Sequence, residues 1–172
     1  MGKFLKLLAA AAFVLVLAFA AAFLILGPER LWAQFGPADL GAVDFAALAR
    51  RATPNDALAC LPEFCAAKAD VPAPVIALPV AQAFPAVEQA LLREPRVSLA
   101  AADPDQGTLR LVQRSALLGF PDTIDVKLAP MADGSTAVLI YSRSQIGTAD
   151  MGVNLARVTR WAGLIATAAN EP

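Results

Sequence analysis

Arginine, serine and aspartate side chains gather in two short stretches of this sequence, and together they could bind an anion. Two guanidinium groups beside a helix N-terminus would hold a phosphate or a carboxylate through charge-assisted hydrogen bonds. The alternative is a scaffold, in which the aspartates neutralise the arginines and Asp150 caps the following helix. We favour the scaffold, because two aspartates suffice to neutralise two arginines. The predicted polar cluster consists of Arg114, Ser115, Asp122, Ser142, Arg143, Ser144, Asp150 and Asn154.

The pattern of hydrophobic residues explains how these two stretches would meet. From Arg96 onward, apolar and polar residues alternate in four successive runs separated by short turns, as in Ile124–Leu128, which predicts an antiparallel meander. The strands of a meander alternate in direction. The loop after the second strand (residues 115–121) and the segment after the fourth (residues 144–150) therefore lie at the same end of the sheet. We expect the predicted polar cluster at that end, beside the start of the last helix.

The loop between the second and third of these strands is unusually apolar. Hairpin loops are normally polar, so Leu117, Leu118 and Phe120 need burial somewhere. The interpretation we favour is that the loop folds back under the first helix of the domain. The alternative is that these three side chains form an interface, docking on a membrane surface or on a membrane-protein partner.

The composition argues against several classes of function. The chain has no histidine and a formal net charge of −1, so it lacks the commonest general base and metal ligand, and the basic footprint of a nucleic-acid-binding protein. Beyond the N-terminal region its lysines are Lys68 and Lys127, and neither falls in the predicted polar cluster. A hydrolase would need a Ser–Lys pair or paired carboxylates. We predict no catalytic residue, no metal and no cofactor, and we rank an enzyme as the least favoured class.

An uncharged apolar run, Leu7–Leu26, follows two lysines at the start of the chain. A helix of about 20 residues spans about 30 Å, the thickness of a bilayer's hydrocarbon core, so residues 1–27 are predicted to be a retained transmembrane anchor. A cleavable signal peptide is the alternative, but its apolar region is normally only about 7–15 residues long. The lysines before the span, against Glu29 and Arg30 after it, favour a cytoplasmic N-terminus. We expect a single-pass protein of the bacterial inner membrane with residues 27–172 in the periplasm.

Residues 28–71 are interpreted as a tether between this anchor and the folded domain. Asp44 is predicted to cap a short helix that runs to Arg51. Cys60 and Cys65 are close enough in sequence to form a disulfide that closes a small loop in an oxidising compartment. A redox-active pair is the alternative, but such pairs normally have the spacing Cys-x-x-Cys and a cationic neighbour that stabilises a thiolate.

Residues 72–172 are predicted to be an α+β domain with the order β-α-β-β-β-β-α. Prolines around Val75–Leu78 allow only an edge strand there, and helical spacing predicts helices over Ala81–Glu94 and Met151–Ala168. The antiparallel sheet of four to five strands would carry both helices on one face, and Arg157 would point away from it. The residues predicted to face the sheet from the last helix are Met151, Leu155, Val158, Ala162 and Ile165.

Two motifs at the end of the predicted sheet resemble those of a known family. The first runs Arg114-Ser115-x-x-x-Gly119-Phe120-Pro121-Asp122, and the second runs from Ser142-Arg143-Ser144 through Gly147 and Asp150 to Gly152-Val153-Asn154 and Arg157-Val158. Together they are similar to the family called domain of unknown function 1499 (DUF1499), over about residues 56–172. That family commonly has Pro-Asn-Cys where this chain has Glu63-Phe64-Cys65. The resemblance implies a membrane span before the domain and supplies no assigned activity.

Three classes of function remain. The first, which we favour, is a membrane-anchored interaction or accessory protein whose periplasmic domain contacts a membrane complex through the apolar loop. The second is a binding module for a small anionic or apolar ligand at the Arg114, Arg143 and Asp150 end of the sheet, and a cavity above about 300 Å³ would favour it. The third is an enzyme. The expected partners are the lipid bilayer, through residues 7–26, and a membrane protein complex; nucleic acid is not expected.

Overall fold

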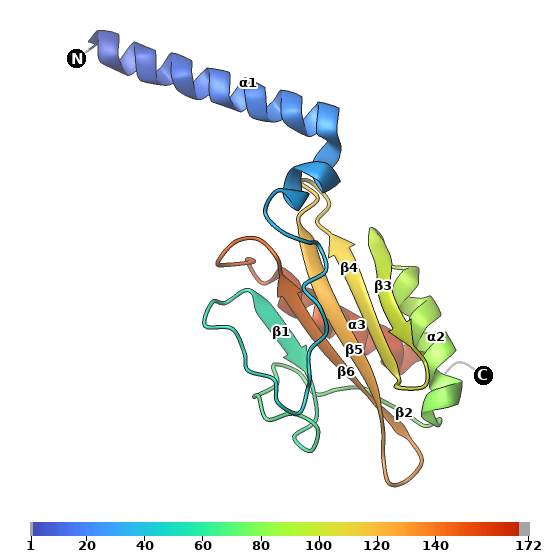
Figure 1. Ribbon diagram of the computed structural model, residues 1–172. Helices are drawn as coiled ribbons and strands as arrows, with labels where there is room; N and C mark the ends of the chain where they lie inside the picture. Colours follow the sequence, from blue (N-terminus) through green and yellow to red (C-terminus); the bar gives the residue numbers. More distant parts are fainter. Residues whose placement is uncertain (1, 169–172) are drawn as a thin grey trace. The chain divides into compact units, whose positions relative to one another are not determined.

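The computed structural model describes residues 2–168, and the chain divides into two compact units at the boundary between Gly36 and Pro37. The first unit contains α1 (Gly2–Ala33), and the second contains the sheet and two further helices (Figure 1). Met1 of the predicted anchor and residues 169–172 of the predicted α+β domain lie outside the described residues.

The helix α1 is long and apolar enough to cross a membrane. Its most apolar window has a mean hydropathy of 2.8, and none of that window is buried. The predicted span, residues 7–26, lies inside α1, and the helical geometry breaks directly after it, because Gly27 adopts a φ of 76° and Pro28 follows. A signal sequence would pass the same test of length and composition, so α1 is a candidate membrane span by that test.

Four consecutive strands form the antiparallel meander that the alternating pattern predicts. Arg114 pairs with Pro121, and Asp122 pairs with Ser144. The loop 115–120 and the segment that follows the fourth strand therefore lie at one end of the sheet, as predicted, with the turn between the third and fourth strands at the other end (Figure 1). The four strands are β3 (Val97–Asp103), β4 (Thr108–Arg114), β5 (Pro121–Pro130) and β6 (Thr136–Ser144).

The edge of β6 that faces away from β5 pairs with two short strands, which makes a six-stranded sheet. β1 (Asp56–Ala59) lies beside residues 140–143, and β2 (Val75–Ile76) lies beside residues 136–137. β2 falls within the predicted edge strand. β1 lies in the segment predicted to be the tether, because four residues make too short a pattern to identify a strand whose partner is distant in the chain.

Both helices of the second unit pack on one face of the sheet, as predicted (Figure 1). They are α2 (Val80–Leu92) and α3 (Val153–Ala168). Phe84 and Leu91 of α2 and Trp161 of α3 are buried in a core shared with alternate residues of the strands. The residues of β5 that join this core are Ile124, Val126 and Leu128.

The stripe of α3 that faces the sheet differs from the predicted one. Val158 and Ile165 are buried as predicted, but Met151 precedes the helix and is fully exposed, and Leu155 is 45% exposed. Arg157, predicted to point away, is buried. The prediction is wrong here because the strands beneath the first turns of α3 offer polar partners, so an arginine and an asparagine can face inward. The buried stripe consists of Asn154, Arg157, Val158, Trp161 and Ile165.

The opposite face of the sheet, which we call the far face, is covered by the segments that flank β1 within residues 37–73. Figure 1 shows part of this segment running across the strands on the side away from α2 and α3. Its apolar residues form a second core with Leu58, Leu139 and Tyr141 of the sheet. Much of the predicted tether therefore belongs to the folded unit.

The short helix predicted from Asp44 to Arg51 is a turn instead. Asp44 accepts a hydrogen bond from Ala46 N at 3.0 Å, so it stabilises a turn rather than a helix. A helix of eight residues is too short to be stable by itself. Phe45 and Leu48 are buried against the sheet, and this packing decides the conformation.

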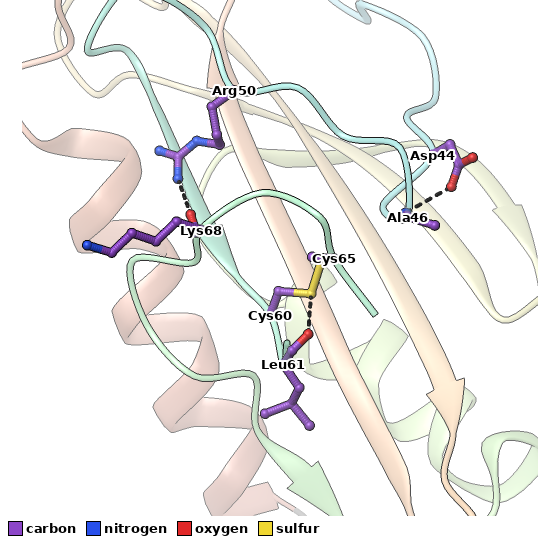
Figure 2. Close-up of a disulfide and its surroundings, with 7 residues drawn as sticks. All are labelled: Asp44, Ala46, Arg50, Cys60, Leu61, Cys65 and Lys68. Atoms are coloured by element: carbon purple, nitrogen blue, oxygen red, sulfur yellow. Dashed lines mark hydrogen bonds between the residues drawn. A yellow bond between two sulfur atoms is a disulfide. The ribbon is translucent and has the colours of Figure 1, made fainter. Parts of the chain in front are cut away.

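The structure contains the predicted disulfide between Cys60 and Cys65, and its loop lies over the far-face core (Figure 2). Arg50 ties this region to the sheet. It donates to Lys68 O at 3.1 Å, as Figure 2 shows, and forms an ion pair of 2.7 Å with Asp56 of β1. Burial opposes ionisation of Asp56, but its hydrogen bonds from Arg50 and Tyr141 outweigh burial and lower its pKa.

Candidate functional site

Arg157 of α3 is the centre of a buried set of hydrogen bonds on the helix side of the sheet, which we call the Arg157 network. Its guanidinium donates to Asp122 Oδ2 at 2.7 Å and to Ser142 Oγ at 2.8 Å. Its Nε donates to Gln113, a buried residue of β4. The Arg157 and Asp122 side chains are only 4% and 7% exposed, so each charge depends on the other for its stability.

Asn154 connects the Arg157 network to the start of α3. Its Oδ1 accepts from Ser142 Oγ at 2.5 Å and from Arg157 at 2.7 Å. Its Nδ2 donates to Ser144 Oγ at 2.9 Å and to Asp150 Oδ2 at 2.7 Å. Asp150 also accepts from two backbone amides at 2.9 and 2.8 Å, so it caps the helix as predicted.

Five residues of the predicted polar cluster therefore assemble, and three do not. Arg143 lies on the far face, because successive side chains of β6 point to opposite sides of the sheet. Arg114 and Ser115 stabilise their own hairpin loop: Arg114 donates to Gly119 O at 3.1 Å, and Ser115 Oγ accepts from Phe120 N at 3.0 Å. The residues that assemble are Asp122, Ser142, Ser144, Asp150 and Asn154.

Three members of the Arg157 network were not identified from the sequence, namely Arg157, Gln113 and Asn55. Asn55 donates to Gly147 O at 2.7 Å, and its own carbonyl accepts from Asn154 at 3.1 Å. The signal for Arg157 is its position one turn after Asn154 and four residues before Trp161, the spacing of a single helix face. Gln113 and Asn55 carry no local signal, because their partners are distant in the chain.

The Arg157 network is closed, and its buried charges, Arg157 and Asp122, neutralise each other. Among the described residues, the buried side-chain atoms without a hydrogen-bond partner do not belong to it. An added phosphate would have to displace Asp122 from Arg157 and leave a buried carboxylate unpaired, which costs several kcal/mol, on the order of 3–5. The geometry thus supports the scaffold interpretation over an anion site.

A second pair of buried charges, Asp125 and Arg143, lies on the far face. Arg143 Nη2 is 3.3 Å from Asp125 Oδ2 and donates to Gly41 O at 2.5 Å, and its guanidinium carbon is 5.5 Å from the centre of the Tyr141 ring. Asp125 Oδ2 and Arg143 Nε nevertheless have no hydrogen-bond partner. Burial raises the pKa of Asp125 to about 6, although the charges of Arg143 and Arg110 oppose the shift.

Asp125 lines a cavity of about 480 Å³, which we call the far-face cavity. Strands β3, β4 and β5 form one side, and residues 42–46 with Phe64 form the other. Small-molecule sites generally measure about 300–1,000 Å³, so this cavity could hold a small ligand. The charged residues that line it are Asp44, Asp103, Arg110, Asp125 and Lys127.

The sequence matches the family model for DUF1499, described as a protein of unknown function, over residues 51–164. The chain belongs to this family. The DUF1499 region begins before β1 and ends within α3, so it contains the Arg157 network and the disulfide loop. Residues 42–46, on one side of the far-face cavity, lie outside it. No curated protein matches the chain.

The DUF1499 region also contains the apolar loop. Leu117 is 85% exposed and Leu118 is 36% exposed, so Leu117 does not fold back under α2, the arrangement favoured from the sequence. Phe120 is half-buried. Met151 is fully exposed and has a φ of 54°, a left-handed conformation that costs a residue with a side chain about 1–2 kcal/mol.

Two pairs of opposite charge lie near the far-face cavity, Arg110 with Asp39 and Arg143 with Asp125. Asp39 accepts from Arg110 at 2.7 Å, and although burial opposes ionisation, this hydrogen bond and one from Gly41 lower the pKa of Asp39. Within residues 2–168, no three histidine, cysteine, aspartate or glutamate side chains are grouped so that they could hold a metal ion.

Proposed function

We propose that this protein is a membrane-anchored interaction protein whose folded unit docks on the outer surface of the bilayer that holds its anchor. The membrane is the bacterial inner membrane, the folded unit lies in the periplasm, and the protein has no catalytic activity of its own. α1 supports the anchoring through its length and hydropathy. The Cys60–Cys65 disulfide supports a compartment outside the cytoplasm, because cytosolic thiols are kept reduced.

The observation that carries this proposal is that exposed apolar side chains lie where the anchor joins the folded unit. Leu117 and Met151, 85% and 100% exposed, belong to the two connections at one end of the sheet. Thr123 Oγ1, near the start of β5, donates to Ala38 O at 3.0 Å and accepts from Leu40 N at 3.0 Å. These bonds hold the first residues of the folded unit at that same end, which we call the anchor end.

The anchor end stays within reach of the bilayer whatever path the linker takes. Residues 27–36 join the predicted span to the folded unit, and a linker of ten residues covers at most about 36 Å when fully extended. A neighbouring membrane protein would have to be recruited to this surface. The bilayer is always present at that distance, so the bilayer is the surface on which we expect the anchor end to dock.

Basic side chains accompany the apolar ones at the anchor end. Arg96 donates to Arg114 O at 3.0 Å, and Arg51 donates to Ser144 O at 2.6 Å. The anchor end therefore carries three guanidinium groups beside its exposed apolar side chains. They are those of Arg51, Arg96 and Arg114. This combination suits a bilayer surface, because aliphatic side chains enter the interface and each cation gains about 1 kcal/mol from anionic headgroups.

Brominated lipids test the docking in the full chain. Leu117→Trp is reconstituted in nanodiscs that contain phosphatidylglycerol, and fluorescence is compared between ordinary and brominated acyl chains. We expect the added tryptophan to be quenched beyond the background from Trp32 and Trp161, measured on the unsubstituted protein. Leu78→Trp is the matched control, because Leu78 is 37% exposed and its carbonyl accepts from Thr136 at the other end of the sheet.

Equal quenching at the two positions, or none at Leu117→Trp, would contradict docking on the bilayer. Replacing Arg96 and Arg114 with glutamine should reduce the quenching in phosphatidylglycerol but leave it unchanged in phosphatidylcholine. A Leu117→Trp side chain that is unquenched by lipid but cross-links to a membrane protein in native membranes would instead assign this surface to a membrane complex.

A second candidate function, binding of a small ligand, is supported by the far-face cavity. Its volume of about 480 Å³ falls in the range of small-molecule sites, about 300–1,000 Å³. Arg114, Arg143 and Asp150 do not line it, so this site differs from the ligand site predicted from the sequence. The cavity and the anchor end use different residues, so ligand binding and docking are compatible.

A further inference from the structure

The far-face cavity combines a largely apolar lining with a few charged groups. Val43, Phe45 and Phe64 line one side, and Ala101 and Ala102 of β3 line the other. Small-molecule sites commonly have this composition, in which apolar surface supplies affinity and a few polar groups fix the orientation of the ligand.

The cationic groups of the cavity already have partners. Arg110 Nε donates to Asp39 Oδ1 at 2.7 Å, and Lys127 Nζ donates to Gln106 O. An anionic ligand would have to compete with the carboxylate of Asp39 for Arg110. The three aspartates that line the cavity also outnumber its two cations. Both observations argue against an anion as the ligand.

Among the described residues that line the cavity, Asp125 has a buried side-chain atom with unused hydrogen-bonding capacity. Its side chain is 6% exposed, and Arg143 Nη2 lies 3.3 Å from its Oδ2. This contact is an ion pair without hydrogen-bond geometry, so Oδ2 has no hydrogen-bond donor. An ionised carboxylate oxygen can accept two hydrogen bonds, and leaving a buried acceptor unsatisfied destabilises the protein. The missing partner is therefore a donor.

We propose that the far-face cavity binds a small molecule that has an apolar body and one hydrogen-bond donor, an amine or a hydroxyl, and that the carboxylate of Asp125 turns toward this donor when the molecule binds, because Oδ2 is buried from solvent in the empty protein. The apolar body lies between the two phenylalanines and the alanines of β3. Residues 42–46 lie outside the DUF1499 region, whereas Phe64, Asp125 and the alanines of β3 lie within it.

Three naphthalene derivatives test the site with one apolar body and three polar ends. The full chain in nanodiscs is titrated with naphthylmethylamine, naphthylmethanol and naphthoate, and binding is followed by ligand-observed NMR with empty nanodiscs as the blank. We expect saturable binding of the amine and the alcohol. We expect naphthoate to bind at least about tenfold more weakly, because a carboxylate offers Asp125 no donor and adds a like charge.

Two variants and a matched control connect this binding to the cavity. Asp125→Asn should lower the affinity for the amine about tenfold or more, because it removes a charge-assisted hydrogen bond. Ala101→Trp should abolish binding of all three probes by filling the cavity. Ala132→Trp adds the same side chain at an exposed position of the β5–β6 turn and should change nothing.

Several results would overturn the proposal. They are the absence of saturable binding to the unsubstituted protein, a preference for naphthoate, or an amine affinity that Asp125→Asn leaves unchanged. Asp125→Asn keeps the inference falsifiable if Ala101→Trp fails to fold. These outcomes are independent of the docking experiment, since neither Leu117 nor Met151 lines the cavity.

Discussion

The helix side and the far face of the same sheet each bury an arginine–aspartate pair, but only the pair on the helix side has its buried hydrogen-bonding atoms satisfied. On the helix side, Arg157 donates to Asp122 and also to Ser142 and Asn154, and neither charged residue has a buried side-chain atom without a hydrogen-bond partner. On the far face, Arg143 and Asp125 are 3.3 Å apart, and each retains a buried atom without a hydrogen-bond partner.

This difference separates a scaffold from a candidate binding site. A completed buried network stabilises one arrangement of the chain and has little to offer a ligand. An incomplete one destabilises the empty protein, and a ligand that supplies the missing donor recovers that free energy. Proteins commonly retain such local destabilisation where function requires it. We therefore expect substitutions on the two faces to change stability in opposite directions.

The largest effect should come from breaking the pair on the helix side. Arg157→Met leaves the carboxylate of Asp122 buried and unpaired, so the free energy of unfolding should fall by about 3–5 kcal/mol, as measured by denaturant unfolding. Arg160→Met is the matched control, because Arg160 is 50% exposed in its pair with Glu94, and an exposed pair contributes only about 0–1 kcal/mol. Equal losses in the two variants would show that the Arg157 network is not a scaffold.

Asp125→Asn should act in the opposite direction and depend on pH. The folded pKa of about 6 lies above the ordinary value of about 3.9. The folded state therefore keeps a proton that the unfolded state releases, and the stability this supplies is present below about pH 4 and lost as the pH rises through 6. Asparagine has no charge to bury. The variant should gain up to about 2–3 kcal/mol over the parent between pH 4 and pH 8.

The measurement for Asp125→Asn is chemical unfolding of both proteins across this pH range. Asp105→Asn, an exposed position in the β3–β4 turn, is the control and should show no such trend. A stability difference that stays constant with pH would mean that Asp125 is ionised as easily as a surface carboxyl, and the contrast between the two faces would disappear.

The smallest effect concerns the cap at the edge of the Arg157 network. Asp150→Ala removes the acceptor for two backbone amides at the start of α3 and should lower the free energy of unfolding by about 1 kcal/mol. The change should appear as a lower thermal midpoint. Asp105→Ala should stay within about 0.5 kcal/mol of the parent. If Asp150→Ala had no effect, the cap would be replaceable by water.

The features that the sequence predicts correctly are those with a local pattern. Alternation identifies β3 to β6, helical spacing identifies α2 and α3, and the position of Asp150 before an apolar run identifies a cap. The meeting of the 115–120 loop with the end of β6 follows from strand direction alone. None of these inferences requires knowledge of a partner that is distant in the chain.

The features that could not be predicted from the sequence are those that depend on partners distant in the chain. From the sequence alone, Arg157 is expected to be a surface residue, because nothing local indicates that Asp122 and Gln113 lie beneath it in the folded protein. Asp125 is likewise expected on a polar, outward face, because the local pattern does not show that the segment before the sheet covers it. The burial of these two residues leaves no periodic signal in the sequence. A charged residue that is neutralised by a distant residue cannot be told from a charged residue on the surface.

The pairing of β1 with β6 imposes an order on the assembly of the molecule. Asp56 pairs with Arg143, so the ribosome completes the first partner long before it begins the second, and non-local pairing of this kind is slow. Cys60 and Cys65 are only five positions apart, so in an oxidising compartment they can be joined before the rest of the chain arrives. A nascent chain would thus hold a closed covalent ring beside an unpaired strand, exposed to proteases and to neighbouring chains until β6 arrives.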